Sequence, residues 1–380
     1  MTGTVRMPAF RVVFFLCVFL AGCSGGGGSN PAPPPSAAAL TDIPSLMEYY
    51  HVPGVSIAIL ENSKVARLLV YGVANANTGQ PVTESTRFQA GSISKSVAAV
   101  TALKFVQDGR IGLDDNINAV LTSWQLPSNS FTAIRNVTLR MLLNHTAGTT
   151  VHGFDGYRST DPLPTLIQVL NGSPPANSPP IVVDKVPGDG FRYSGGGYVV
   201  MQQALMDLLG KPFATIAKET VLEPLAMTDS TYEQPLPATE SSSASAAHDS
   251  SGNVLQGGTH IYPELAAAGL WTTPRDLALF LIELQLSLQG SSNQLISTSL
   301  AAEMLSPPPG SRYGLGFDTI NAGGEQYFGH TGVNAGFQLA MIAHRSKGMG
   351  AVIMTNGDNG GPLIDKILAI IESTEKWPGF

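Results

Sequence analysis

The sequence predicts an α+β fold in which an antiparallel sheet flanked by helices forms one lobe and a mainly helical segment is inserted as a second lobe. Strand patterns stand near both ends of the chain, whereas roughly residues 100–260 carry helical patterns joined by long loops rich in Pro, Ser and Gly. Hydrophobic residues make up 43% of the chain and charged residues 13%, which suits a large buried core. We therefore expect a folded region at residues 40–380, with an α/β lobe at about 40–105 and 262–380 and a helical lobe at about 106–261.

The folded region is predicted to begin with a helix over Thr41–Tyr50 and a hairpin. Val55–Leu60 and Val65–Gly72 are rich in β-branched and apolar residues and predict two strands, with a turn at Glu61–Ser63. Helical spacing then predicts three helices: Ser96–Gln107, Leu139–Asn144 and Tyr198–Leu209. Near the C-terminus the pattern predicts three strands and a closing helix: Tyr313–Phe317, Gly336–Ala343, Gly350–Thr355 and Pro362–Glu372.

The first residues are expected to be an export signal rather than part of the fold. Arg6 and Arg11 precede an apolar run at residues 12–20, which is shorter than the roughly 20 residues that a membrane-spanning helix needs. The run ends in Leu20-Ala21-Gly22-Cys23, which resembles the bacterial lipobox, whose cysteine carries the lipid after cleavage. We therefore expect a lipoprotein signal peptide at residues 1–22 and a lipid on Cys23. An ordinary signal peptide with a chance cysteine, or an uncleaved anchor, fits the same residues.

Residues 23–39 follow as lipid anchor and tether, in which glycines give flexibility and prolines give reach. Ser24 stands after the cysteine, where an aspartate would signal inner-membrane retention. Resemblance to Gram-negative lipoproteins therefore implies an exported protein on the outer membrane, facing the periplasm or the cell surface. The membrane is an expected partner, but nucleic acid is not, because the formal net charge is −7. The oligomeric state is left open.

Motifs for metal and phosphate chemistry are missing from the sequence. No His-Glu-x-x-His and no phosphate-cradling glycine loop occurs, and the seven histidines lack the spacing of metal ligands. Residues 22–26 match G-x-S-x-G, but they fall in the signal junction and not in a strand-turn-helix elbow. We therefore expect neither a metal nor another cofactor.

A serine followed three residues later by a lysine occurs twice, at Ser92/Lys95 and at Ser373/Lys376. The second pair lies at the end of the last predicted helix, where both residues are ordinary on a surface. Ser92 instead opens a strongly apolar helix, and residues three apart share one helix face, so the Lys95 amine can reach the Ser92 hydroxyl. Burial and the positive end of the helix dipole both disfavour a protonated lysine, which makes Lys95 a usable base. An N-cap serine beside a solvated lysine is the alternative.

Three segments in order favour the first interpretation: Phe88-Gln-Ala-Gly-Ser-Ile-Ser-Lys95, Gly190-Phe-Arg-Tyr-Ser-Gly-Gly-Gly-Tyr198 and Phe328-Gly-His-Thr-Gly-Val-Asn-Ala-Gly-Phe337. They resemble the active-site motifs of the serine β-lactamase and penicillin-binding-protein superfamily, and most of all its class C-like branch, which includes esterases and D-amino-acid peptidases. The resemblance runs from about residue 40 to residue 372. It implies a β-lactamase/transpeptidase-like fold.

The same resemblance implies roles for individual residues. Ser92 would attack a carbonyl group to form an acyl-enzyme, Lys95 would be its base, and Tyr193 would move the proton to the leaving group. The backbone N–H groups of Ser92 and Val333 would form the oxyanion hole. Substrate would bind along a strand at the edge of the cleft, through His330, Thr331 and Gly332. His145 is expected to tie down the helical lobe, while His248 and His260 give no catalytic signal.

Two positions depart from the β-lactamases of this branch, in which the second motif ends in asparagine and the third begins with lysine. Here these residues are Gly195 and His330. Glycine offers no amide to a substrate, and histidine is largely neutral near pH 7. Both changes favour a serine hydrolase of esterase or D-amino-acid-peptidase type, acting on a small-molecule or peptide substrate. A β-lactamase with relaxed motifs and a catalytically weak penicillin-binding or cell-wall-binding lipoprotein remain the alternatives.

Overall fold

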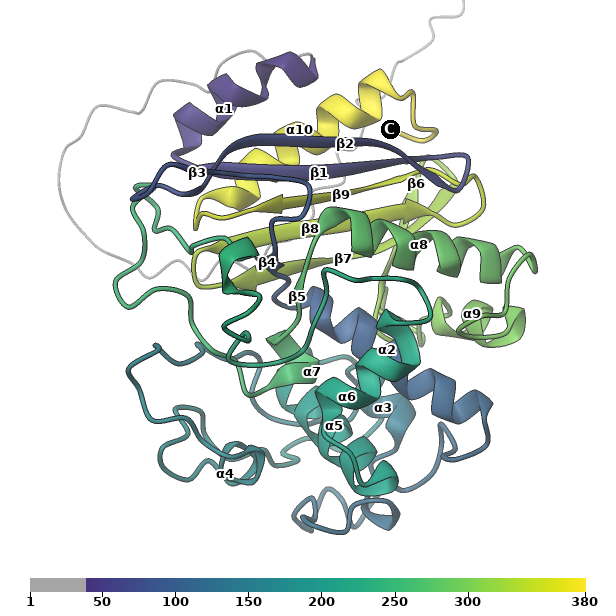
Figure 1. Cartoon of the computed structure of the whole chain (residues 1–380). Coiled ribbons are helices and arrows are strands. Elements are labelled where there is room, and N and C mark those ends of the chain that lie inside the picture. The colour runs from purple at the N-terminus through teal and green to yellow at the C-terminus, as the bar shows by residue number, and fades with distance from the viewer. Residues whose placement is uncertain (1–38) are drawn as a thin grey trace, which may run out of the picture.

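The structure, a computed structural model, describes residues 39–380 and is built on a seven-stranded antiparallel sheet (Figure 1). The signal peptide and Cys23 predicted above lie outside the described residues. The strand order is β3-β2-β1-β9-β8-β7-β6. The strands of this sheet are β1 Gly54–Glu61, β2 Lys64–Asn75, β3 Gln80–Pro81, β6 Asp318–Ala322, β7 Glu325–Asn334, β8 Phe337–His344 and β9 Gly350–Thr355.

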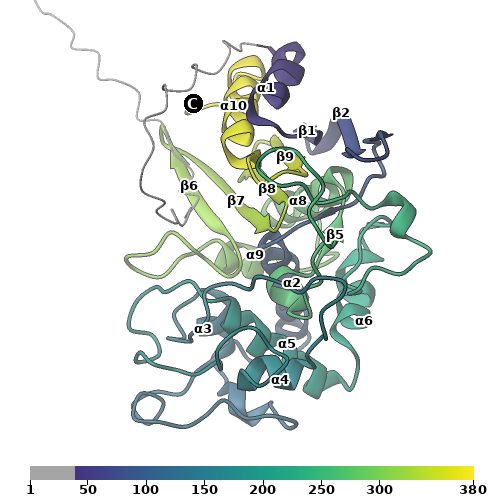
Figure 2. The ribbon, with the colours of Figure 1, turned by 90° about the vertical axis from the view of Figure 1, so that its left-hand side faces the viewer.

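Helices cover both faces of this sheet, as Figure 2 shows from the side. On one face lie α1 (Ile43–Tyr50) and α10 (Gly360–Thr374), and on the other lies α8 (Pro274–Leu288), which packs against β1, β2, β8 and β9. Successive strand residues point to opposite faces, so Ile57 and Ile59 of β1 join the core under α1 and α10, while Ala58 joins the core on the other side. The chain thus has the antiparallel sheet flanked by helices that the sequence predicts.

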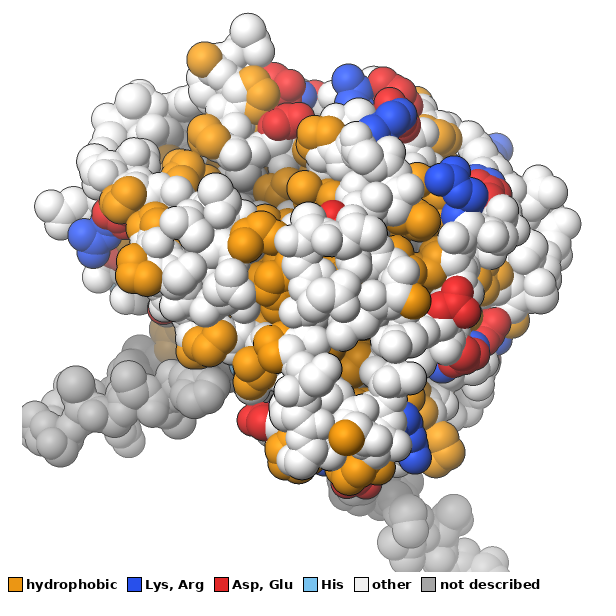
Figure 3. All heavy atoms as spheres, turned by 90° about the horizontal axis from the view of Figure 1, so that it is seen from below, with side chains coloured by type: hydrophobic (Ala, Val, Ile, Leu, Met, Phe, Trp, Pro, Cys, Tyr) orange, Lys and Arg blue, Asp and Glu red, His pale blue; other side chains and the backbone are white. Residues whose placement is uncertain are grey.

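The second lobe is mainly helical and lies below the sheet in Figure 1. Its helices and the small elements beside it are α3 Leu139–Leu143, α4 Leu166–Asn171, α5 Gly195–Leu209, α6 Phe213–Ala217, α7 Leu265–Ala268, α9 Thr298–Met304, the two-stranded ribbon of β4 Phe88–Gln89 and β5 Trp271–Thr272, and short helical turns at Ile117–Ala119, Lys218–Leu222 and Ser241–Ser243. A further short turn, Leu40–Asp42, precedes α1 on the other side of the sheet. From below, this lobe shows hydrophobic side chains interspersed with backbone and other side chains, and its charged side chains are few and scattered (Figure 3).

Between the lobes runs α2 (Ile93–Gln107), which packs against α5 and α7 on one side and β7 and β8 on the other. Every residue from Ile93 to Leu103 is buried. A helix with small and apolar residues all round, such as Val97, Ala98, Ala99 and Val100, has no face to leave in water. Its first turn is therefore held rigidly at the junction of the lobes.

The predicted strand at Tyr313–Phe317 is wrong, because the strand β6 begins only at Asp318. Gly316 has a φ of +91°, which ends any extended conformation, and the Gly314 N–H donates to the Phe317 carbonyl oxygen at 2.8 Å. Tyr313 makes only an isolated bridge to Asp318. The helices predicted from Ser96 and Tyr198 start earlier, as α2 and α5, since their first turns contain few of the apolar residues that mark helical spacing.

Candidate active site

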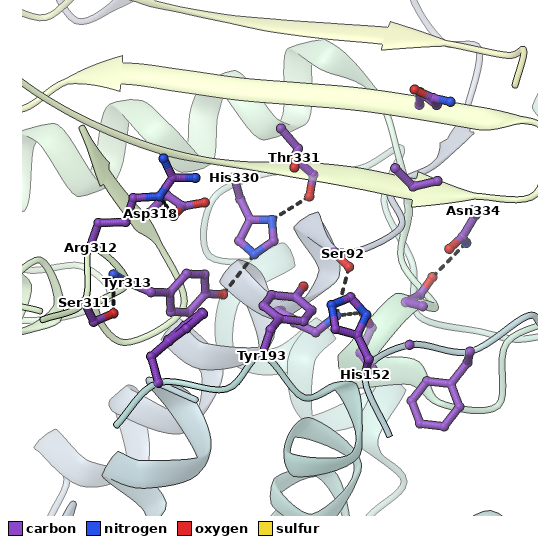
Figure 4. A pocket seen from close by; sticks show the side chains of 18 of the residues that line it. Ser92, His152, Tyr193, Ser311, Arg312, Tyr313, Asp318, His330, Thr331 and Asn334 are labelled. Atoms are coloured by element: carbon purple, nitrogen blue, oxygen red, sulfur yellow. Dashed lines mark hydrogen bonds and ion pairs between the residues drawn. The ribbon is translucent and has the colours of Figure 1, made fainter. Parts of the chain in front are cut away.

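A cavity of about 700 Å³ opens where the start of α2, the segment before α5 and the strand β7 meet (Figure 4). Of the residues singled out from the sequence, Ser92, Lys95, Tyr193, His330, Thr331 and Val333 all line it. Gly332 is not part of the lining. The segments that carry these residues are far apart in the chain, and the fold brings them to one place.

Ser92, the N-cap residue of α2, and Lys95, in its first turn, are in direct contact. The Lys95 ammonium Nζ donates to the Ser92 Oγ at 2.9 Å and to the carbonyl oxygen of Ala267, on α7, at 2.8 Å. Lys95 is only 2% exposed, and burial lowers the pKa of its amine to about 7. The neutral amine is therefore well populated near pH 7, where it can accept the hydroxyl proton of Ser92.

The backbone before Ser92 touches the backbone of β7. Gly91 has a φ of +51°, and a Cβ there would lie 2.5 Å from the Val333 nitrogen. A Cβ on Gly332 would lie 2.0 Å from the Ala90 carbonyl oxygen. Only glycine allows this approach on both sides, which sets Val333 beside the N-terminal end of α2. The Ser92 N–H stands just before the helix, where backbone N–H groups lack a helical partner.

Tyr193 faces the Ser92/Lys95 pair from the segment before α5. Its ring centroid is 5.0 Å from the Lys95 Nζ. Burial raises the pKa of its hydroxyl well above the usual value, and a hydrogen bond with Ser92 acts in the opposite direction. The hydroxyl therefore keeps its proton near pH 7, so Tyr193 acts in this site as a phenol rather than a phenolate.

His145 packs against Tyr193 and binds the backbone of the residues on either side of it. Its carbonyl oxygen accepts from the Arg192 N–H at 2.8 Å, and its Nδ1 accepts from the Ser194 N–H at 3.1 Å. The imidazole centroid is 4.2 Å from that of Tyr193. Burial, then the nearby charge of Lys95, lowers the His145 pKa well below its usual value, so the ring is neutral with its proton on Nε2. His145 thus holds the backbone on both sides of Tyr193.

His330 is also neutral. Burial, followed by the charge of Lys95, lowers its pKa to about 3. Its Nδ1–H donates to the Thr331 carbonyl oxygen, and its Nε2 accepts from the Tyr313 hydroxyl at 2.9 Å. With both ring nitrogens engaged, His330 supplies the cavity with no positive charge.

The strand β7 presents a free edge to this cavity. The neighbouring strand β6 pairs with β7 only from Glu325 to Gly329, so the stretch from His330 onward has no partner strand on that side. At its end Asn334 donates to the Gln89 side chain at 3.0 Å and to the Ala268 carbonyl oxygen at 3.1 Å. These bonds fix β7 against β4 and α7, beside Lys95 and its partner Ala267.

Sequence reasoning missed a second set of cavity residues, which come from loops and from the first position of β6: His152, Phe154, Phe191, Arg312, Tyr313 and Asp318. Loop residues carry no hydrophobic period, so no pattern marks them. The one available signal was Phe191, which stands within the segment Gly190–Tyr198 that resembles a family motif.

The alternative serine–lysine pair lies outside the cavity. Ser373 and Lys376 are exposed at the end of α10, and Lys376 is past the helix with a φ of +52°. His248 accepts from the Ala76 N–H at 3.1 Å, and His260 contacts the Asp155 carbonyl oxygen, so both have structural partners away from the cavity lining. Within residues 39–380, no group of three His, Cys, Asp or Glu side chains is placed to hold a metal ion.

A family model described as Beta-lactamase matches residues 41–374 of the chain. "Protein flp" from Staphylococcus aureus is 24% identical over 321 residues, which are 80% of this chain and 60% of that protein. A "Beta-lactamase" from Pseudomonas fluorescens is 29% identical over 185 residues, 49% of this chain and 47% of that protein. The chain thus spans about 60% or less of these curated relatives' length.

Solved structures share the fold. The octameric penicillin-binding protein homologue from Pyrococcus abyssi superposes with a TM-score of 0.71 at 23% identity, covering 88% of this chain and 77% of that one. D-amino acid amidase from Ochrobactrum anthropi gives 0.68 at 24% identity, covering 85% and 94%. The β-lactamase/transpeptidase-like fold expected from the sequence is confirmed.

Proposed function

Because the chain belongs to the β-lactamase family, we propose that it is a serine hydrolase that cleaves an ester or amide through an acyl-enzyme on Ser92. One observation carries this proposal. The buried Lys95 amine, whose pKa is lowered to about 7, lies 2.9 Å from the Ser92 hydroxyl and can take its proton.

In this mechanism the Ser92 Oγ attacks the substrate carbonyl carbon while its proton passes to the neutral Lys95 amine. The carbonyl oxygen becomes an anion held by the backbone N–H groups of Ser92 and Val333. As the carbon–heteroatom bond breaks, the Tyr193 hydroxyl donates its proton to the leaving group and is reprotonated from Lys95. Water then attacks the acyl carbon, and its proton passes through Tyr193 and Lys95 to the Ser92 oxygen. The acid is released and Ser92 is restored.

An ester or amide substrate is favoured over a β-lactam by the two unusual positions. His330 is neutral, with both ring nitrogens engaged, so it offers no cation to a substrate carboxylate. Gly195 offers no amide group to a substrate side chain. A β-lactamase remains the second candidate, favoured by the family match over residues 41–374.

Turnover of p-nitrophenyl acetate and of nitrocefin by the purified chain tests this choice. We expect fast ester hydrolysis with slow nitrocefin turnover, and loss of both in Ser92→Ala. Rapid nitrocefin turnover would instead establish a β-lactamase. A long-lived stoichiometric adduct with labelled penicillin would indicate a weak penicillin-binding protein.

We also propose that the protein is an exported lipoprotein anchored through Cys23, on the basis of the lipobox-like residues 20–23. Cys23→Ser should move the protein from the membrane fraction to the soluble periplasmic fraction. Continued membrane attachment of this variant would refute the anchor.

A further inference from the structure

The cavity beside Ser92 has an apolar wall that the mechanism does not use. Large hydrophobic side chains that stay exposed in a folded protein often mark a binding surface. Among the described residues, Phe191 is 43% exposed and Val333 is 49% exposed, and both line this cavity. Phe154, which is half-buried, lies on the same lining. The exposed apolar area of these side chains thus faces the space where a substrate would lie.

Phe154 occupies the space that a side chain at position 195 would need. A Cβ on Gly195 would lie 3.0 Å from the Phe154 Cε2 and 3.1 Å from the His152 carbonyl oxygen. Gly195 begins α5 two residues after Tyr193, so this space is next to the proposed proton donor. The Phe154 ring therefore fills the space beside Gly195, and position 195 contributes no polar group to the cavity.

Phe191, two residues before Tyr193 in the chain, is held in position by neighbouring rings. Its ring packs edge-on against His145, with centroids 5.9 Å apart, and lies 6.0 Å from the ring of Tyr313. His145 and Tyr313 are both buried and hydrogen-bonded, so the two rings that Phe191 packs against are fixed in position. An aromatic ring that is fixed by its neighbours and still partly exposed to a cavity is suited to pack against a flat apolar ligand.

The two permanently charged side chains that line the cavity, Arg312 and Asp318, compensate one another. Arg312 places its Nε 3.0 Å from the Asp318 Oδ1, and both residues line the cavity. His330 carries no charge at neutral pH, because burial lowers its pKa to about 3. Within the part of the chain that the structure describes, no unpaired permanent cation lines this cavity to attract a substrate carboxylate.

We propose that Phe154 and Phe191 form an aromatic binding surface that selects substrates carrying an uncharged aromatic group next to the bond that is cleaved. This inference rests on the proposed function, since it assigns the substrate class of the same Ser92 site. Phe154 is the specificity-determining residue, because it fills the position beside α5 from which a polar side chain would otherwise reach the substrate.

Boronic acids test this inference, because boron accepts the Ser92 oxygen reversibly and needs no leaving group. The inhibition constants of methylboronic acid, benzylboronic acid and 4-carboxybenzylboronic acid would be measured against p-nitrophenyl acetate hydrolysis. Burial of a phenyl ring on an aromatic surface should make benzylboronic acid bind at least about tenfold more tightly than methylboronic acid. The carboxylate of the third compound should cancel most of this gain.

Substitutions of Phe154 and Phe191 then test whether these residues cause the preference for the benzyl compound. Phe154→Ala and Phe191→Ala should each reduce the benzyl-to-methyl ratio several-fold and leave the affinity for methylboronic acid within about twofold. Phe154→Leu, which keeps an apolar side chain, guards against a folding defect and should retain part of the ratio. Ile134→Ala is the matched control, since Ile134 is 67% exposed and does not line the cavity, and it should change nothing.

Equal affinities for the methyl and benzyl compounds would overturn the inference, as would tighter binding of the carboxylate or an unchanged ratio in Phe154→Ala. In each of these cases ester hydrolysis that depends on Ser92 would leave the proposed function standing. If no ester were hydrolysed and no boronic acid bound, the proposed function and the inference would fall together.

Discussion

The lowered pKa of Lys95 makes a quantitative prediction for the pH dependence of the reaction. Burial moves this pKa from an ordinary value of 10.5 to about 7, a change equivalent to about 5 kcal/mol between the charged and neutral forms. Only the neutral amine can accept the Ser92 proton. The value of kcat/KM should therefore rise about tenfold per pH unit up to about pH 7 and then level off, so that at pH 5 it is about a hundredfold below its plateau.

The assay is the initial rate of p-nitrophenyl acetate hydrolysis from about pH 5 to about pH 9, corrected for the spontaneous reaction. Protonation of Lys95 also acts on folding. Between about pH 7 and pH 10.5 the unfolded chain binds this proton and the folded chain does not, so stability rises with pH across that interval. Circular dichroism at each pH therefore has to accompany the rates, and only folded samples count.

A matched variant assigns the titration to Lys95. Glu264 is fully buried at the start of α7, and burial raises the pKa of its carboxyl to about 7 as well. Neither His330, with a pKa of about 3, nor His145, with a pKa well below its usual value, titrates in this range. Glu264→Gln should leave the midpoint unchanged. A flat profile, a midpoint near 10, or a midpoint that disappears in Glu264→Gln would refute the role of Lys95.

Substitutions at three further positions test the arrangement around Ser92. Tyr193→Phe removes the proton donor and should lower kcat by about 10²- to 10⁴-fold, with an unchanged melting temperature; wild-type kcat would exclude the role of the hydroxyl. His145→Ala leaves the Ser194 N–H without its acceptor and should cost about 1–3 kcal/mol of unfolding free energy and lower kcat more than it changes KM. His145→Asn, whose side chain tolerates the φ of +60° and retains an acceptor, should restore part of that kcat, and a variant no better than alanine would contradict the positioning role. Gly332→Ala forces a Cβ to within 2.0 Å of the Ala90 carbonyl oxygen and should cost about 1–3 kcal/mol in thermal or urea unfolding and most of the activity; a fully active, stable variant would show that the two backbones need not touch.

Local sequence patterns predicted the Ser92/Lys95 contact, the burial of α2 and the sheet. Ser92 and Lys95 are three residues apart on one helix, so their contact follows from helix geometry alone. The apolar character of α2 on all sides indicated that this helix is buried, and burial is what lowers the Lys95 pKa. The strands at both ends of the chain predicted the sheet for the same reason, since alternation along a strand is a local signal.

Contacts between distant residues account for what could not be predicted. The hydrogen bond from the Ser194 N–H to His145 joins residues 49 positions apart, and the Tyr313 hydroxyl reaches His330 from a loop. Phe154 enters the cavity because Gly195 leaves room for its ring, which no periodic pattern reveals. The predicted strand at residues 313–317 failed because the φ of +91° at Gly316 breaks an apolar run that otherwise resembles a strand.

Locating the acyl group by mass spectrometry is the sharpest test of Ser92 as the nucleophile. The chain would be quenched in acid during turnover of a slow ester or after treatment with a fluorophosphonate probe, then digested and sequenced. We predict one modified peptide, carrying the added mass on Ser92, and its complete loss in Ser92→Ala. An adduct on another residue, or undiminished labelling of Ser92→Ala, would exclude Ser92 as the nucleophile.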